Sequence, residues 1–319
     1  MISFVIVPFL LVFELLLYHT KNDMFVNSFT AVNTFDVFVK STFVPNWRDF
    51  DSHQASGNLL SLKLICYVTL YDTMLCRTEK PVLESPSNLY STSVSSSNSN
   101  DRRIRRNSFD QPGTPFEIHF DYSGVVSYAV EKDDVESMRM NNVYRMIANQ
   151  MNVGAYNIYD HSDFYPIMER STVGYCPTNF TTTRYPSSKK KILSKTLTPF
   201  FLEMFDKHGS VLISKYRNID ECTELSHYSF AVRYWHELVP ALSVTEHVKK
   251  SESFITMDKD TLESTTENSF DFLDKNGKRI GSVVEAIVLK LTSVDIKSKH
   301  GEFDNNLAYR LDVINNDKI

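Results

Sequence analysis

The sequence predicts a mainly β protein with one central α-helix. The chain contains 22 Phe and 16 Tyr against nine Gly, and flat aromatic rings pack well on pleated sheet surfaces. Short runs of alternating apolar and polar residues recur along most of its 319 residues, whereas residues 133–152 have helical spacing instead. A hydrophobic content of 42% can support the core of one large β domain or two ordinary ones.

The amino-terminal residues suggest entry into the secretory pathway. Residues 2–18 are almost wholly apolar, so residues 1–20 are interpreted as a signal-like segment. An uncleaved anchor is the alternative, although the run is marginal for a bilayer core of about 30 Å. Four cysteines behind such a start indicate two disulfides in a secreted protein. None of them forms a C-x-x-C pair, so the sequence predicts no metal site.

Two early segments, 34–46 and 58–83, are rich in β-branched and aromatic residues. The second is long for one strand, and a turn near Tyr71 would fold it into a hairpin. Cys66 and Cys76 would then lie directly opposite each other, close enough to form a cross-strand disulfide. Two free buried thiols are the alternative.

Residues 85–113 differ in composition from the segments on either side. Eight serines fall between Ser85 and Ser99, and such a stretch cannot bury enough apolar surface to offset its ordering entropy. We therefore expect a disordered surface loop. Four arginines follow the serines and form either a protease-processing site or a solvated basic loop: Arg102, Arg103, Arg105 and Arg106.

The middle of the chain combines a predicted hairpin with the predicted helix. Residues 116–120 and 126–130 alternate in polarity around Ser123-Gly124. Asp133 or Asp134 could cap the helix that follows. Its apolar residues recur at helical spacing and cover more than one face, which a helix wrapped by a sheet would explain: Met140, Val143, Tyr144, Ile147 and Met151.

The rest of the chain reads as strands and turns. Strand patterns fall near residues 165–184, 211–217, 226–235, 253–257, 268–274 and 279–294. Asn276-Gly277 is the strongest hairpin signal, and it is typical of a type I′ turn. Asn179-Phe180-Thr181 is the only N-x-S/T sequence, so Asn179 is a candidate glycan acceptor if the chain is secreted.

Nothing in the sequence predicts an enzyme. Asp160, His161 and Asp163 gather in one short segment, but their spacing matches no known catalytic or metal site. We therefore expect no catalytic residue and no cofactor. A net charge of −5 gives no basic field for nucleic acid, so no nucleic-acid partner is expected either.

Three segments in order resemble the vitellogenins, most closely those of insects. Residues 115–153 resemble the family's hairpin with a central Gly followed by a helix. FYPIMERSTVGYCPTNF (164–180) resembles its Met-Glu and Val-Gly-x-Cys stretch, and GSVLISKYRNIDECTELSHYSF (209–230) its Lys-x-Lys/Arg-Asn stretch with a second Cys. This chain has Pro177-Thr178 where the family usually has Glu-Thr.

The resemblance implies a partly open antiparallel β-barrel wrapping a buried helix. It assigns residues 21–298 to a vitellogenin-type module, and 299–319 to a polar tail or the start of a missing domain, because full-length members are much longer. It also implies a disulfide between Cys176 and Cys222. Such a protein would transport lipid as cargo, act as a nutrient reservoir and be secreted.

A low-density-lipoprotein-type vitellogenin receptor is the implied protein partner. Lys215 and Arg217 lie in a stretch that resembles a receptor-recognition strand, where acidic receptor modules would capture exposed basic side chains. Lys189, Lys190 and Lys191 could widen that basic patch. The alternative to receptor contact is a solvated strand face and a mobile loop. Two other functions stay open: a lipid-transfer subunit of the microsomal triglyceride transfer type, and an unrelated membrane-anchored β-rich binding module.

Overall fold

The structure of the protein is a computed structural model. It describes residues 29–46, 56–70, 73–86, 104–108, 115–121, 124–131, 138–153, 165–185, 210–226, 245–258, 261–298 and 307–312. Within these ranges the chain forms a 14-stranded sheet, one α-helix and one short 3-10 helix. All strand pairs for which a register is observed are antiparallel. The prediction of a mainly β protein with one helix is therefore confirmed.

The elements follow one another along the chain as β1 (Phe29–Pro45), β2 (Ser56–Leu70), β3 (Thr73–Pro86), β4 (Ile104–Ser108), β5 (Phe116–Asp121), β6 (Gly124–Glu131), α2 (Met138–Gln150), β7 (Tyr165–Ser171), β8 (Gly174–Tyr185), β9 (Ser210–Arg217), η5 (Ile219–Glu221), β10 (Glu224–Leu225), β11 (Thr245–Met257), β12 (Leu262–Leu273), β13 (Arg279–Ser298) and β14 (Leu307–Asp312).

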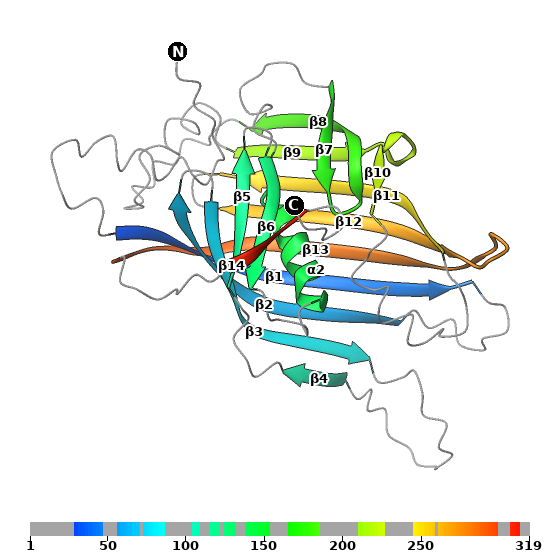
Figure 1. Ribbon diagram of the computed structural model, residues 1–319, viewed down its shortest axis with the longest axis horizontal. Coiled ribbons are helices and arrows are strands. Elements are labelled where there is room, and N and C mark those ends of the chain that lie inside the picture. The colour runs from blue at the N-terminus through cyan, green and yellow to red at the C-terminus, as the bar shows by residue number, and fades with distance from the viewer. Residues whose placement is uncertain are drawn as a thin grey trace, which may run out of the picture.

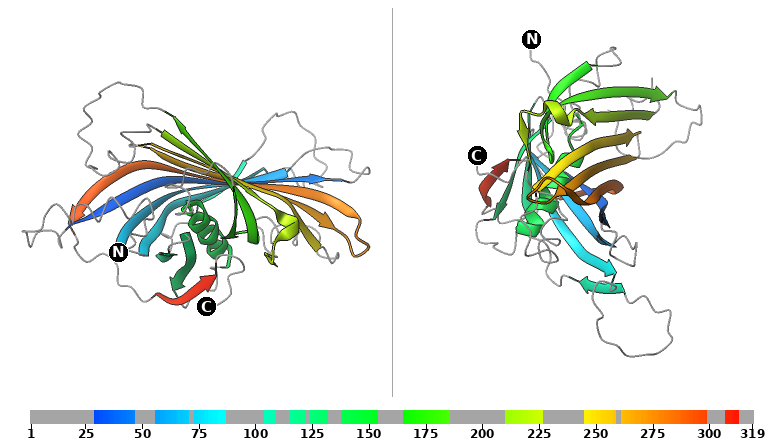
Figure 2. Two further views of the ribbon diagram at one scale, coloured as in Figure 1. Left: turned by 90° about the horizontal axis from the view of Figure 1, so that it is seen from above. Right: turned by 90° about the vertical axis from the view of Figure 1, so that its right-hand side faces the viewer.

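The sheet is open and curls around the helix. Its strands follow the order β10-β8-β9-β11-β12-β13-β1-β2-β3-β5-β6-β14, with β4 paired to β3 and β7 paired to β8. The long strands β11, β12, β13, β1 and β2 lie side by side across the middle (Figure 1). Seen from above, α2 lies between these long strands and β14 (Figure 2). No pairing among the described strands closes the sheet into a barrel.

Helix α2 is buried on all its sides. Every residue from Asn142 to Gln150 is buried, which confirms the sequence prediction of an enclosed helix. The observed helix begins at Met138, and residues 132–137, where the predicted caps Asp133 and Asp134 fall, lie outside the described residues.

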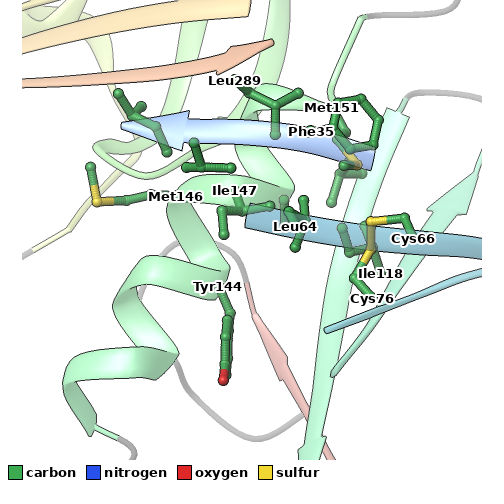
Figure 3. Close-up of a cluster of buried hydrophobic side chains, with 14 of the residues drawn as sticks. Phe35, Leu64, Cys66, Cys76, Ile118, Tyr144, Met146, Ile147, Met151 and Leu289 are labelled. Atoms are coloured by element: carbon green, nitrogen blue, oxygen red, sulfur yellow. A yellow bond between two sulfur atoms is a disulfide. The ribbon is translucent and has the colours of Figure 1, made fainter. Parts of the chain in front are cut away.

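One half of the helix packs into an apolar core (Figure 3). Tyr144 stacks on Phe116 of β5 with ring centroids 4.2 Å apart. Ile147 is fully buried in the same cluster. Burying one such side chain contributes about 1.5–3 kcal/mol, so this half supplies much of the attraction between helix and sheet. The sheet contributes Phe35, Leu62, Leu64, Met74, Ile118 and Leu289.

Strands β2 and β3 form the hairpin predicted around Tyr71. Cys66 lies opposite Cys76 in their register, and a disulfide joins the two. Both cysteines are fully buried against the apolar core. The alternative of two free thiols is therefore wrong in this structure.

The hairpin between β12 and β13 forms at the predicted place, but not with the predicted turn. Gly277 has φ 75°, whereas Asn276 is not among the residues with positive φ, so the turn is not type I′. The N–H of Gly277 donates to the carbonyl of Asp274 at 2.9 Å, and the Asp274 carboxylate accepts from the N–H groups of Asn276 and Lys278. This Asp side chain stabilises a turn with one left-handed residue, an arrangement common in longer hairpin loops.

Two glycines with positive φ should differ in their tolerance of a methyl group. Gly277→Ala meets no atom within 4 Å and should cost only the left-handed backbone, about 1–2 kcal/mol. Gly124 has φ 122°, and the Cβ of Gly124→Ala would collide with Oδ1 of Asn152, so this change should lower the free energy of unfolding by more. Urea unfolding of both variants measures the difference, and equal losses would contradict the close packing at Gly124.

The predicted disordered loop 85–113 is wrong in part. Residues Ile104–Ser108 form β4 and pair with β3, with Arg105 opposite Ser85 and Arg106 opposite Glu84. This short segment, which begins with the β-branched Ile104, adds one edge strand to the sheet. Arg102 and Arg103 lie outside the described residues.

Candidate functional site

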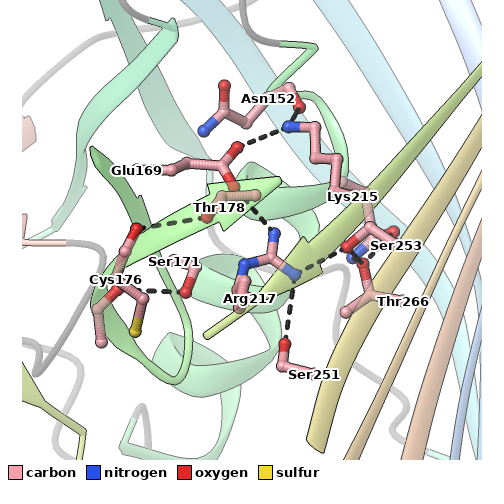
Figure 4. A network of polar contacts seen from close by, with 12 residues as sticks. Asn152, Glu169, Ser171, Cys176, Thr178, Lys215, Arg217, Ser251, Ser253 and Thr266 are labelled. Atoms are coloured by element: carbon pink, nitrogen blue, oxygen red, sulfur yellow. Dashed lines mark hydrogen bonds and ion pairs between the residues drawn. The ribbon is translucent and has the colours of Figure 1, made fainter. Parts of the chain in front are cut away.

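A buried cluster of charges lies where β7 and β9 meet the end of α2 (Figure 4). The Glu169 carboxylate on β7 accepts from Nζ of Lys215 at 2.5 Å and from the Arg217 guanidinium at 3.1 Å, both on β9. All three side chains are almost fully buried. One carboxylate therefore bridges two cations inside the protein.

Neutral groups complete this charge cluster. Lys215 also donates to the carbonyl of Asn152, just past the last residue of α2, where the helix dipole favours a cation. Arg217 donates to the hydroxyls of Ser251 and Ser253 on β11, at 3.1 and 2.9 Å. The cluster thus ties β7, β9, β11 and the end of α2 together.

The cluster keeps Glu169 ionised. Burial alone would raise the pKa of its carboxyl, but Lys215 and Arg217 outweigh burial and hold the pKa below its usual value. Burial lowers the pKa of the Lys215 ammonium, and the attraction of Glu169 offsets this only in part because Arg217 repels it.

The structure corrects the role expected for Lys215 and Arg217. Lys215 is 1% exposed and Arg217 is 7% exposed, so neither can present an open basic side chain to an acidic receptor module. Along β9, both share the inward face with Val211 and Ile213 and alternate with outward residues. That alternation places them inside, and Glu169 of β7 compensates their charge.

A polar seam beside the charge cluster links α2 to the surrounding strands. We use this name for the helix residues Arg145 and Gln150 with the inward Ser and Thr residues they contact. Gln150 donates to the hydroxyl of Thr266 at 2.8 Å and accepts from Ser264 at 3.0 Å, both on β12. Arg145 donates to Ser226 at 3.1 Å. These directional bonds fix the rotation of the helix against β12, which apolar contacts alone do not.

A raised pKa near Arg145 gives a pH-dependent prediction. Burial raises the pKa of Glu246 to about 8, with Glu285 adding to the rise and Arg145 opposing it. Because the folded pKa lies above the ordinary 4.5, stability falls as pH rises through this window. Glu246→Gln should therefore raise the free energy of unfolding at pH 9 and leave it unchanged at pH 4. The gain should be roughly 2 kcal/mol, less than the full pKa rise would give, because water screens this partly exposed carboxyl. Urea unfolding at both pH values measures this, and a variant less stable at pH 9 would contradict it.

A second disulfide lies beside the charge cluster. It joins Cys176 of β8 to Cys222, which follows η5. Cys176 is fully buried in a small cluster with Val173, Val248 and Phe270. The disulfide thus holds the connection after β9 against β8. Two disulfides fit an oxidising compartment.

The other candidate residues either face away from this site or lie outside the described residues. Asn179 lies on the outward face of β8, between Pro166 of β7 and Tyr216 of β9. Lys189, Lys190 and Lys191 lie outside the described residues, as do Asp160, His161 and Asp163. Sequence reasoning missed Glu169 as a partner of Lys215, although its period-2 spacing from Ile167 placed it on a strand.

Within the described ranges, no three His, Cys, Asp or Glu side chains gather in a way that could hold a metal ion. No helix in the same part of the chain is long and apolar enough to span a membrane.

The comparisons with known proteins agree with this architecture. The profile of the Vitellogenin N-terminal domain matches residues 48–300, well over half of the chain. The chain belongs to the vitellogenin family. No curated protein matches it by sequence.

The vitellogenin fold is also seen in a solved structure. A chain described by the words "lipid-protein interactions in lipovitellin" matches 89% of this chain with a TM-score of 0.54 at 9% identity. The present chain spans 27% of that chain's length. The outer membrane protein AlkL in DMPC lipid bilayers matches with a TM-score of only 0.18 at 8% identity, over 87% of this chain and 93% of its own. A TM-score this low does not show a shared fold. The open sheet curled around a buried helix is therefore lipovitellin-like.

Proposed function

We propose that this chain is the sheet module of a secreted, vitellogenin-type lipid carrier that also serves as a nutrient reservoir. The observation that carries the proposal is the likeness to lipovitellin, whose sheet-and-helix arrangement extends over 89% of this chain. The two disulfides support a secreted location, because such bonds persist in oxidising compartments. The module would act by binding and not by catalysis.

Lipid contact would use the outer face of the sheet, since the core around α2 fills the inner face. Phe38 and Val44 of β1 and Val284 of β13 lie on that outer face, exposing 42%, 48% and 37% of their surface. Val284 lies opposite Thr42, so these apolar groups share one face across two strands. Exposed apolar area of this kind gains free energy when it leaves water.

Flotation of the purified full chain with phosphatidylcholine vesicles tests the lipid proposal. The chain should float with the vesicles, and the double variant Phe38→Ser/Val284→Ser should float less. Thr42→Ser, on the same face, is the matched control and should float like the parent. A parent chain that stays at the bottom of the gradient would overturn lipid binding by this module.

Receptor recognition stays part of the proposal only through residues other than Lys215 and Arg217. Lys189, Lys190 and Lys191 are the remaining basic candidates for an acidic receptor module. Replacing all three by Gln should abolish salt-sensitive binding to acidic, calcium-loaded receptor repeats. Unchanged binding would remove these lysines from the proposal.

Cellular location separates the remaining alternatives. A lipid-transfer subunit of the microsomal triglyceride transfer type would stay inside secretory cells, whereas a yolk-type carrier would reach the medium. A membrane-anchored binding module would keep residues 2–18 at its mature amino terminus, which amino-terminal sequencing reads directly.

A further inference from the structure

One outward region of the sheet combines exposed apolar side chains with the only glycosylation sequence of the chain. Pro166, Asn179 and Tyr216 lie in one row across β7, β8 and β9, because Asn179 is directly opposite each of the other two. Met168 lies opposite Pro177 on the same face. We call Pro166, Met168, Pro177 and Tyr216 the Asn179 patch.

The Asn179 patch is apolar and open to solvent. Met168 exposes 36% of its surface and Tyr216 exposes 41%. Tyr216 also touches Phe254 of β11 edge-on, with ring centroids 6.0 Å apart, so the apolar surface continues onto the next strand. Contiguous exposed apolar surface of this kind usually has a partner that covers it.

The protein covers one neighbouring ring with its own side chain but leaves Tyr216 open. On the same outward face, the guanidinium of Arg170 lies over the Tyr175 ring, 5.4 Å from its centroid. Tyr216 has no such cation over its ring among the described contacts. Its direct neighbours on the adjacent strands are Asn179 of β8 and Glu252 of β11, whose carboxylate pairs with Lys250.

Asn179 can receive a glycan before the sheet forms. Thr181 supplies the hydroxyl that the sequence N-x-S/T needs, and Phe180 between them points inward. Cys176 pairs with a cysteine 46 residues further along, which enters the secretory compartment only after Asn179. The disulfide therefore cannot close around Asn179 before the transferase meets it. Once β8 pairs with its neighbours, the acceptor side chain faces outward.

We propose that Asn179 carries an N-linked glycan that lies over the Asn179 patch and keeps this apolar surface from other molecules. The sugar is the covering group that the row Pro166–Asn179–Tyr216 lacks. Its attachment forms a bond from the Asn179 amide nitrogen to C1 of the first sugar and breaks the bond between that carbon and the diphosphate oxygen of a lipid-linked donor. The lipid diphosphate leaves, and the amide nitrogen gives up one proton to water. The proposal rests on the secretion put forward in the proposed function but not on lipid carriage, because Asn179 lies on other strands than Phe38 and Val284.

Mass spectrometry of the full chain secreted from eukaryotic cells tests occupancy. The peptide containing Asn179 should carry one glycan in most molecules, and Asn179→Gln and Thr181→Ala should both lose it. Thr181→Ser keeps the acceptor sequence and should keep the glycan. A parent peptide that is largely unmodified would overturn the proposal, whatever the variants do.

Dye binding tests the covering role separately. Asn179→Gln and Thr181→Ala should each bind more of a hydrophobic fluorescent dye than the parent at equal far-ultraviolet circular dichroism. Adding Met168→Thr and Tyr216→Thr to Asn179→Gln should return dye binding to the parent level. If the glycan is present but its loss leaves dye binding unchanged in both single variants, the covering role is wrong.

Discussion

Replacing Glu169 by Gln is expected to lower the free energy of unfolding by about 3–5 kcal/mol at pH 7, because the change leaves two buried cations without their counter-ion. Lys215 and Arg217 stay in place with almost no solvent to compensate them. The loss should be partly recovered by adding Lys215→Met, which removes one of the two cations. Urea unfolding of the parent, the single variants and the double variant measures this coupling.

An exposed ion pair supplies the matched control for Glu169. Glu252 on β11 pairs with Lys250 at 2.8 Å, but the lysine is more than half exposed. Glu252→Gln makes the same chemical change and should cost far less, because water replaces the lost partner. Equal losses at the two positions would mean that Glu169 is not buried between two cations.

The same cluster predicts a loss of stability in acid. The folded-state pKa of Glu169 lies below the ordinary 4.5, so its contribution is fully present above 4.5 and is lost as pH falls through the folded-state pKa. The parent should lose stability below pH 4.5 more steeply than Glu169→Gln does.

The two disulfides should differ in what their removal costs. Cys176 and Cys222 are 46 residues apart, and Cys66 and Cys76 are 10 apart. In the chain-entropy model the longer loop contributes about 4 kcal/mol and the shorter one about 3 kcal/mol. Replacing each pair by alanines and following thermal unfolding measures both contributions. The opposite order of the two losses would show that packing of the buried sulfurs, and not loop closure, dominates.

Alternation and spacing predicted the elements whose inward residues are apolar. The helix carries Val143, Tyr144 and Ile147 toward the core, and β5 alternates between buried and half-buried residues. The Cys66–Cys76 register followed from the turn alone, because opposed residues in a hairpin are fixed by its centre. A local pattern of apolar residues is therefore sufficient to predict an element when its buried residues are the apolar ones.

Sequence reasoning was weaker where the inward face is polar. β11 and β12 begin before the predicted strands 253–257 and 268–274. Their inward residues include the polar Ser251, Ser264 and Asn268, so alternation of apolar residues did not reveal the full strands. No apolar stripe marks such a strand. Ser264 and Thr266 of β12 meet Gln150 of α2, which comes from more than 100 residues earlier in the chain, so no local window could reveal the contact.

The charge cluster was misinterpreted for the same reason. Lys215 and Arg217 share the inward face with Ile213, but their charge favoured an exposed interpretation. Only the partner Glu169, brought from another strand, makes their burial tolerable. Along a strand, the alternation of positions is a better guide to burial than the type of a single residue.

Native-state hydrogen exchange of α2 tests most directly whether the sheet encloses it. The amides of residues 144–150 should exchange only through global unfolding, with the same free energy as the amides in the middle of β1 and β13. Exchange of these helix amides at a much lower free energy, while β1 and β13 stay protected, would show that α2 opens to solvent on its own and would contradict the account.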